Sequence, residues 1–488
     1  MGVIAEARPV PGRAGAVRWS GLSVLARQGL QVVFAIVLAR LLGPESYGAV
    51  GAATVLVTLS ALLLDQGLAA ALVQRPELPR SAPGAAATVN LAAAAVLAVV
   101  VLLAAPALGA FFSTPDLPGM LLWLAPGLLV KGAAIAPRAM LLRRLALATV
   151  AKGEVAGSVL GVAAGLVAAL AGAGPAAFVV LTLLSDLVLT AVLLVSERGP
   201  VPNLRLAAFT PLAGFGARVF ATNAVAYLSR NTDTVLVGRF LGPASLAQYA
   251  MAYRVLVIPV QLLGQTVNRV LFPVLSRLQG DREALGREMT RTTALLAIAA
   301  IPIMTLVACA AGQLVPLVLG AAWLPAAPVM AVLALAGARE TVFYSTPVLM
   351  RAAGEAGLGL RFQLLSTAVQ VAGIVAGLPF GMLGVAVGYA VAGVLVTPLL
   401  LLVQRRLAGT SVPAQLRTLL PAVHAAVWGA LAYRLVAQAV GAASPVAVLA
   451  AGTVTFVLTA GAVLLLVHRR AATEAWRDVR AVAGRRRR

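Results

Sequence analysis

Polar side chains in this sequence recur on single faces of long apolar segments, where they supply positive charge and hydrogen-bond partners. In the segment 244–275, four of them are separated by seven, four and three positions: Arg254, Gln261, Gln265 and Asn268. These spacings place them on one face of a helix, and almost all positions between them are apolar. Such a face must lie against protein or water, because an unsatisfied polar group in hydrocarbon is costly.

The segment before it repeats the pattern at spacings of four, three and four: Asn223, Tyr227, Arg230 and Thr234. Asn231 and Asp233 lie on adjoining strips of the same predicted helix. Near the N-terminus, Arg27 and Gln31 are one helical turn apart. Three predicted helices therefore offer cations to a common interior, which indicates a wet cavity inside the protein.

Each of these residues also has a structural explanation. Intramembrane amides such as Gln261 link helices by hydrogen bonds worth roughly 0.6 to 2 kcal/mol apiece. Arg230 and Asp233, three positions apart, can neutralise one another. Several carboxylates fall within apolar segments, and three of them are candidates for a function: Asp65, Asp233 and Glu340. For these we expect either coupling to a proton or sodium ion, or a role in an ion pair.

The composition requires a membrane around these segments. Hydrophobic residues make up 61% of the 488 residues and charged residues 11%, which is more apolar than a soluble domain can bury. Apolar runs of about 20 residues recur without alternating polarity, so the crossing elements are helices. We predict an all-α integral membrane protein with about 14 transmembrane helices. The predicted spans are 19–41, 46–73, 84–112, 117–137, 148–172, 174–196, 211–238, 244–275, 292–319, 325–350, 360–381, 382–404, 415–439 and 445–468.

Most of the 38 Lys and Arg residues lie in alternate connections and in the two tails. Cytoplasmic flanks retain cations during insertion, so both termini are predicted to be cytoplasmic. The net charge of +22 follows mainly from this topology, and we expect no nucleic-acid partner.

An internal repeat divides the chain. LARLLGPESYG at 38–48 aligns with VGRFLGPASLA at 237–247, and six predicted helices separate the copies. An even number of helices gives both copies the same orientation, which predicts two parallel, pseudo-symmetric six-helix lobes. The predicted parts are a basic tail at 1–18, an N-lobe at 19–196, a linker at 197–210, a C-lobe at 211–404, two helices at 415–468 and a basic tail at 469–488.

The repeat and its surroundings resemble a known family. The residues that carry the resemblance are A-R-x-L-G-P at 39–44, D-x-G-L-x-x-A-L-V-Q-R at 65–75, R-N-x-D-x-x-x-x-G-R-x-L-G-P at 230–243, Tyr249, Tyr253, Arg254 and F-P-x-L-S-R at 272–277. The pattern is similar to bacterial polysaccharide-biosynthesis exporters, which are lipid-linked oligosaccharide flippases of the multidrug/oligosaccharidyl-lipid/polysaccharide superfamily. It covers residues 15 to 405.

The resemblance implies a cargo and a mechanism. The cargo is a polyprenyl-pyrophosphate-linked oligosaccharide, of the exopolysaccharide, capsule or O-antigen type, moved from the inner to the outer leaflet of the bacterial cytoplasmic membrane by alternating access of the two lobes. Arg254 and Arg27 have no obvious acid nearby in the sequence and are the predicted pyrophosphate contacts, with Arg230 next. Membrane lipids and the polymerase or glycosyltransferases of the same pathway are the expected partners.

Two other functions remain to be weighed. A multidrug antiporter of the same superfamily usually carries cations, which favours a cavity dominated by acids rather than arginine. A membrane glycosyltransferase or polymerase would place acids or histidine on a sizeable outer loop, whereas the predicted outer loops are short. With two histidines and one cysteine in the chain, we expect no catalytic residue, no metal and no cofactor.

Overall fold

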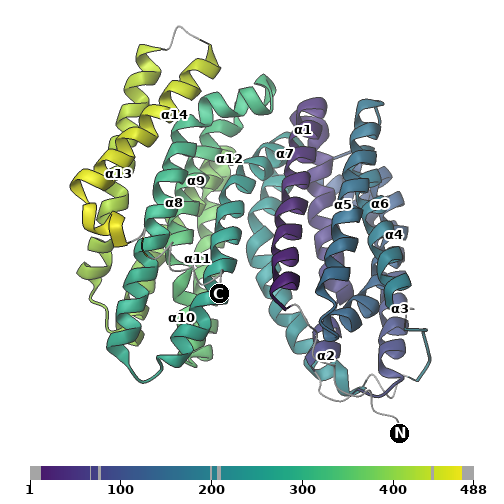
Figure 1. Ribbon diagram of the computed structural model, residues 1–488. Helices are drawn as coiled ribbons and strands as arrows, with labels where there is room; N and C mark the ends of the chain where they lie inside the picture. Colours follow the sequence, from purple (N-terminus) through teal and green to yellow (C-terminus); the bar gives the residue numbers. More distant parts are fainter. Residues whose placement is uncertain are drawn as a thin grey trace. The chain divides into compact units, whose positions relative to one another are not determined.

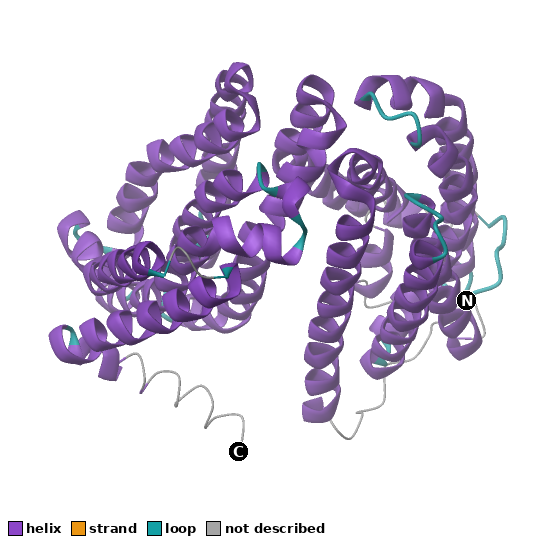
Figure 2. Ribbon diagram, turned by 90° about the horizontal axis from the view of Figure 1, so that it is seen from above, coloured by secondary structure: helices purple, strands orange, loops and turns teal. Residues whose placement is uncertain are grey.

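The computed structural model describes residues 13–65, 68–74, 78–197, 200–205, 210–440, 444–474 and 477, and these are helical apart from short connections (Figures 1 and 2). Backbone contacts divide the chain into two compact units, Met1–Ala247 and Gln248–Arg488. Most of the basic residues predicted for the two tails lie outside the described residues. The boundaries predicted for the lobes stay a prediction.

The first unit contains six helices and the first part of a seventh, up to Ala247. They are α1 (Arg13–Asp65), α2 (Leu68–Gln74), α3 (Ala82–Phe112), α4 (Leu117–Arg143), α5 (Leu147–Leu170), α6 (Ala176–Glu197) and part of α7 (Thr210–Arg277). Figure 1 shows α4, α5 and α6 side by side. The stretch 200–205 is fixed to the start of α3, because Asn203 Nδ2 donates to the Ser81 carbonyl at 3.0 Å.

The second unit holds the remainder of α7 and all later helices. They are α8 (Arg282–Val318), η2 (Ala321–Trp323), α9 (Ala326–Phe343), α10 (Ser345–Ala352), α11 (Ala356–Gly377), η3 (Leu378–Phe380), α12 (Gly381–Ala408), α13 (Val412–Ala439), α14 (Pro445–Ala462) and η4 (Val463–Val467). Two histidines tie the last helices together: His424 Nδ1 and His468 Nε2 are 3.0 Å apart, and Trp428 Nε1 donates to His424 Nε2 at 2.8 Å.

The number of membrane helices agrees with the hydropathy prediction. The described residues contain ten helical segments that are long and apolar enough to cross a membrane. Two of these, Arg27–Asp65 with 39 residues and Gly357–Ala408 with 52, exceed the roughly 20 residues that one crossing needs. With both counted as pairs, and with the 68-residue α7 as a further pair, the fold has 14 membrane helices.

The two repeats break their helices in the same way. Gly43 within α1 has φ 70° and ψ 172°, and Gly242 within α7 has φ 82° and ψ 177°. Both conformations lie in a region that is essentially restricted to glycine, and each glycine precedes a proline that cannot continue the helical hydrogen bonds. The predicted repeat is therefore confirmed as a repeated backbone geometry, and the break divides each long helix into two spans.

The repeats also contact one another directly. A Cβ atom placed on Gly48 would lie 2.5 Å from Pro243 Cβ, and one on Gly51 would lie 3.3 Å from Leu246 Cγ. Small residues three positions apart thus let the helix after the first break approach the second break closely. Tyr227 strengthens this contact, because its hydroxyl donates to the Val55 carbonyl at 2.6 Å.

We expect Gly43→Ala and Gly242→Ala each to lower the free energy of unfolding by about 1–3 kcal/mol, because alanine is strained at this φ and ψ. No atom lies within 4 Å of a Cβ at either glycine, so the loss would come from the backbone rather than a clash. The measurement is the thermal unfolding midpoint of the purified protein in detergent. Gly312→Ala is the matched control, since this helical glycine also has an open Cβ position. A control loss as large as the Gly43→Ala loss would contradict the argument.

Candidate functional site

A chain of charged residues links three helices of the first unit. Glu154 on α5 contacts Arg27 on α1, with Oε2 and NH1 3.5 Å apart, and Arg138 on α4, with Oε1 and NH2 2.5 Å apart. The Glu154 side chain is 10% exposed, whereas Arg27 and Arg138 are 34% and 45% exposed. The carboxylate is therefore buried beneath two cations whose guanidinium groups reach the protein surface. Asp65, at the end of α1, attracts Arg138 electrostatically from a further position.

The packing of α5 against α6 is close, because α5 presents glycines to the α6 backbone. A Cβ on Gly157 would lie 2.6 Å from the Ser185 carbonyl oxygen, and one on Gly161 would lie 2.7 Å from the Leu181 carbonyl oxygen. The glycine-rich face of α5 thus lies directly on the α6 backbone. Glu154, on the same helix, contacts the arginines of α1 and α4.

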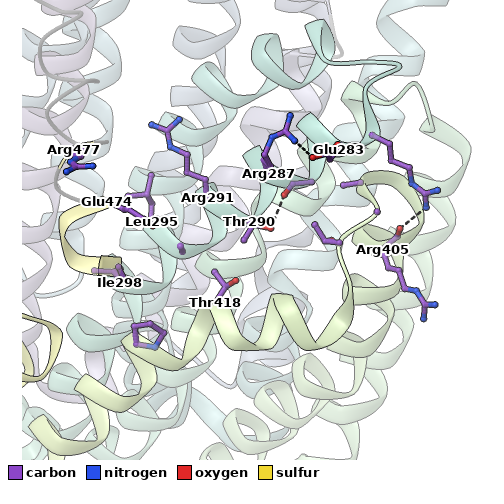
Figure 3. A pocket seen from close by; sticks show the side chains of 18 residues that line it. Glu283, Arg287, Thr290, Arg291, Leu295, Ile298, Arg405, Thr418, Glu474 and Arg477 are labelled. Atoms are coloured by element: carbon purple, nitrogen blue, oxygen red, sulfur yellow. Dashed lines mark hydrogen bonds and ion pairs between the residues drawn. The ribbon is translucent and has the colours of Figure 1, made fainter. Parts of the chain in front are cut away.

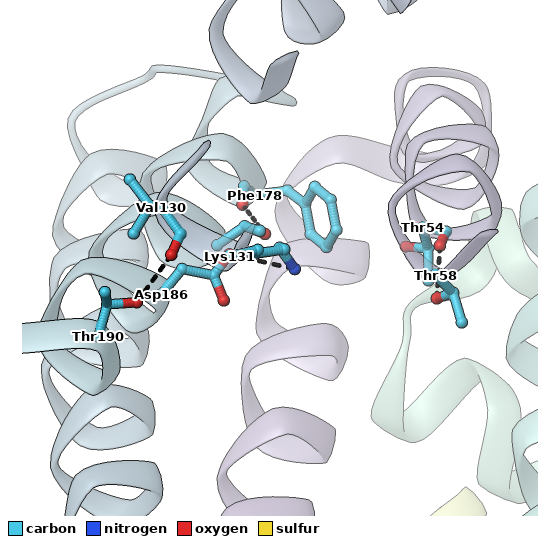
Figure 4. A network of polar contacts seen from close by, with 8 residues as sticks. Thr54, Thr58, Val130, Lys131, Phe178, Asp186 and Thr190 are labelled. Atoms are coloured by element: carbon cyan, nitrogen blue, oxygen red, sulfur yellow. Dashed lines mark hydrogen bonds and ion pairs between the residues drawn. The ribbon is translucent and has the colours of Figure 1, made fainter. Parts of the chain in front are cut away.

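A second ion pair joins α4 to α6. Lys131 Nζ lies 3.1 Å from Asp186 Oδ2, and the two side chains are 21% and 19% exposed. Figure 4 shows the pair beside the bond from the Thr190 hydroxyl to the Val130 carbonyl, which measures 3.2 Å. Lys131 and Asp186 border an otherwise mostly apolar cavity of about 230 Å³ within the first unit. The pair neutralises two charges that neither helix could keep alone in hydrocarbon.

The second unit contains a chain of aromatic and charged residues. The ring of Tyr253 on α7 stacks on Tyr249 and meets Tyr389 of α12 edge-on, with centroids 6.1 Å apart in both pairs. The Tyr389 hydroxyl donates to Glu340 Oε1 on α9 at 2.5 Å. Arg339, next to Glu340, donates from Nε to the Thr397 hydroxyl of α12 at 2.8 Å. Arg339 and Glu340, which are neighbours of opposite charge on α9, are therefore both hydrogen-bonded to α12.

The residues predicted on the first half of α7 divide between surface and interior. Asn223 is exposed, whereas Asp233 is 2% exposed and Thr234 is also buried. Asp233 Oδ1 accepts hydrogen bonds from the Thr234 backbone N–H at 2.7 Å and from the Thr234 hydroxyl at 3.3 Å. Asn231 donates to the Tyr227 carbonyl at 2.9 Å. An Asp233 role in ion coupling, or in pairing with Arg230, stays a prediction.

The other predicted binding residues occupy both units. Gln31 is exposed one turn after Arg27, and Arg254 is half-buried in the second half of α7. The side chains of four further residues lie outside the described part of the structure: Arg230, Gln261, Gln265 and Asn268. Arg27, which has no acid close to it in the sequence, contacts one in the structure. The shared cationic cavity therefore remains a prediction.

Comparison with known proteins assigns the family. A model of the polysaccharide biosynthesis protein family matches residues 37–328. The chain belongs to this family. Its relatives include the lipopolysaccharide biosynthesis protein WzxC of Escherichia coli (strain K12), 27% identical over 76% of each chain, and the succinoglycan biosynthesis transport protein ExoT of Rhizobium meliloti (strain 1021), 26% identical over 65% of each.

This polysaccharide biosynthesis protein has the same two-lobe fold as transporters whose structures have been solved. The lipid II flippase MurJ in an inward closed conformation matches with a TM-score of 0.74 at 13% identity, covering 92% of this chain and 99% of MurJ. A multidrug resistance MATE transporter of the MOP superfamily in an inward-facing conformation matches with a TM-score of 0.61 at 17% identity, covering 80% of this chain and 96% of the transporter. The chain is thus a multi-pass membrane protein with the same fold as these two transporters.

Sequence reasoning missed the partners of the cations. Glu154 and Lys131 are members of interhelical ion pairs that the sequence did not predict. Their position inside predicted spans was an available signal, because a charge within a span requires a partner. The identity of that partner was not readable, since Lys131 and Asp186 lie on separate helices.

We expect Lys131→Met alone to destabilise this polysaccharide biosynthesis protein, because Asp186 would keep a charge without its partner. The double variant Lys131→Met/Asp186→Leu should recover most of the lost stability, since an apolar pair of similar size leaves no charge behind. The measurement is a double-mutant cycle, in which thermal unfolding midpoints are compared for Lys131→Met, Asp186→Leu, the double variant and the unchanged protein. If the two single losses simply add in the double variant, Lys131 and Asp186 are not coupled.

Proposed function

We propose that this protein is a flippase for a lipid-linked oligosaccharide. It moves a polyprenyl-pyrophosphate-linked repeat unit from the inner to the outer leaflet of the bacterial cytoplasmic membrane, with both termini in the cytoplasm. Membership of the polysaccharide biosynthesis family and the MOP fold support transport rather than catalysis. The structural observation that carries the proposal is the Arg27–Glu154–Arg138 chain, in which the cations are the more exposed members.

That arrangement suits a pyrophosphate headgroup. A guanidinium group has five N–H donors and binds phosphate oxygens in a bidentate manner, and the contact of Arg27 with Glu154 is a long one, 3.5 Å between NH1 and Oε2. The buried carboxylate holds the guanidinium groups in place before cargo arrives, so less conformational entropy is lost on binding. Arg254 supplies a further cation from the second unit, and alternating access would bring cargo past both.

The charge pattern also argues against the multidrug alternative. A cationic drug needs exposed acids, whereas Glu154 is nearly covered and its two arginine partners are more exposed to solvent.

Two other carboxylates accept hydrogen bonds inside the protein. Glu340 accepts one from the Tyr389 hydroxyl, and Asp233 accepts one from the Thr234 backbone N–H. We propose Glu340 and Asp233 as carboxylates that could couple transport to an ion, since protonation or sodium binding would compete with the hydrogen bonds that hold them.

We expect Arg27→Ala and Arg254→Ala to abolish export while the protein remains inserted. The physical reason is the loss of the charge-assisted hydrogen bonds to pyrophosphate, which Arg27→Lys would restore only in part because lysine lacks the bidentate geometry. The measurement is polymer production in a flippase-deficient strain, together with the amount of protein in the membrane. Arg361→Ala, an exposed arginine on α11 outside the proposed site, is the matched control. Normal polymer output from both Arg27→Ala and Arg254→Ala would refute the cationic site.

We expect cysteines placed at positions 261, 265 and 268 to react with water-borne thiol reagents when Cys309 is first replaced by serine. The reason is that these three positions share one helix face, which the proposal assigns to a wet cavity. Cysteines at 262 and 263 are the controls, since they lie on other faces of α7. Protection of all three test positions would favour the alternative in which the amides only link helices.

A further inference from the structure

The second unit contains a large basic cavity that the proposed transport site does not use. Its volume is about 1060 Å³, and it lies between the start of α8, the end of α12, the start of α13 and the segment that follows η4 (Figure 3). The charged residues that line it are Arg282, Glu283, Arg287, Arg291, Arg405, Glu474 and Arg477. Five arginines against two glutamates give a formal excess of three positive charges.

The wall changes from basic to apolar along α8. Arg287 and Arg291 are followed, one helical turn apart in each step, by Leu295 and Ile298 on the same face. The facing start of α13 contributes Thr418 and then Pro421. A soluble anion needs only the basic end. An amphipathic molecule with an anionic head and a hydrocarbon chain matches both ends.

One of the lining arginines, Arg282, also joins two helices of the cavity wall. Arg282 NH2 donates to the Arg405 carbonyl at 3.0 Å and to the Arg406 carbonyl at 2.8 Å, which joins α8 to the end of α12. On the other side, the His424–His468 contact fixes where the chain leaves η4, so that Glu474 borders the cavity. The cavity is therefore built by contacts from four parts of the unit.

Arg287 and Arg291 form ion pairs that a bound anion can replace. Arg287 pairs with Glu283 one turn before it, and both side chains are largely exposed. Arg291 NH1 lies 3.7 Å from Glu288 Oε2. Exposed pairs within one helix contribute little to stability. A phosphate group, which accepts charge-assisted and bidentate hydrogen bonds from arginine, can therefore replace them.

We propose that this cavity binds a glycerophospholipid with an anionic headgroup, drawn from the leaflet that meets the start of α8. The phosphate would lie between Arg287, Arg291 and Arg477, and one acyl chain would follow Leu295 and Ile298 between α8 and α13. Basic pockets between membrane helices on the cytoplasmic side are suited to such headgroups. No residue that lines this cavity belongs to the proposed pyrophosphate contact, so we assign to it a resident membrane lipid and not the cargo.

The test is the thermal unfolding midpoint of the full-length protein in neutral detergent, titrated with dioleoylphosphatidylglycerol. A ligand that binds only the folded state raises the midpoint as its concentration increases. We expect a saturable rise with phosphatidylglycerol, and little change with dioleoylphosphatidylcholine or inorganic phosphate. Arg287→Gln/Arg291→Gln should raise the half-saturating lipid concentration at least fivefold. The control Arg277→Gln/Arg361→Gln, which removes the same charge from exposed sites outside the cavity, should leave it unchanged.

Four outcomes would overturn the proposal. Equal responses to phosphatidylglycerol and phosphatidylcholine would show no headgroup recognition, and an equal response to inorganic phosphate would show a simple anion site. A preference for undecaprenyl phosphate that is lost in Arg287→Gln/Arg291→Gln would make this a cargo site. Equal lipid affinity in the cavity and control variants would place the lipid elsewhere. If the double variant does not fold, the single variant Arg477→Gln gives the same comparison, because it lies at the cavity border and outside α8.

Discussion

Hydrocarbon cannot solvate a charge, so each charged side chain within the membrane helices of this protein must find its partner on the protein. The described ion pairs meet this constraint by joining helices that are distant in the sequence: α1, α4 and α5 through Glu154, and α4 and α6 through Asp186. Because the partners lie on different helices, the same contacts that neutralise charge also fix how the helices pack. Arg27 and Arg138 are more exposed as a consequence, because Glu154 is the buried member of both ion pairs.

The same constraint acts on the backbone. A membrane helix satisfies its own hydrogen bonds, and a break is tolerated only where another part of the protein covers it. At Gly242 and Pro243 the cover comes from the first repeat, whose Gly48 and Gly51 remove the side chains that would keep the helices apart. Duplication of the Gly-Pro element thus explains two features together. It ends a span in each half of the chain, and it gives one break a surface on which to pack.

The sequence predicted the helices better than the contacts between them. The predicted span 84–112 is Ala82–Phe112 in the structure, and 445–468 is Pro445–Val467. The prediction was poorest for 292–319, because α8 begins ten residues earlier at Arg282, in a charged stretch that hydropathy excludes. Periodicity identified which face of a helix is polar. It could not identify the facing helix, so Glu154 was not connected to Arg27, nor Tyr389 to Glu340.

The early start of α8 has a wider meaning for the net charge of +22. Arginines that flank a span set its orientation during insertion, and in a loop they would afterwards remain in water. Here the helix extends through Arg282, Arg287 and Arg291, so all three line a defined cavity, and Arg282 also joins α8 to α12. Helical structure thus converts charges that determine topology into charges at fixed positions. A positive charge that determines topology becomes available for recognition wherever a span is continued as a helix beyond the hydrocarbon.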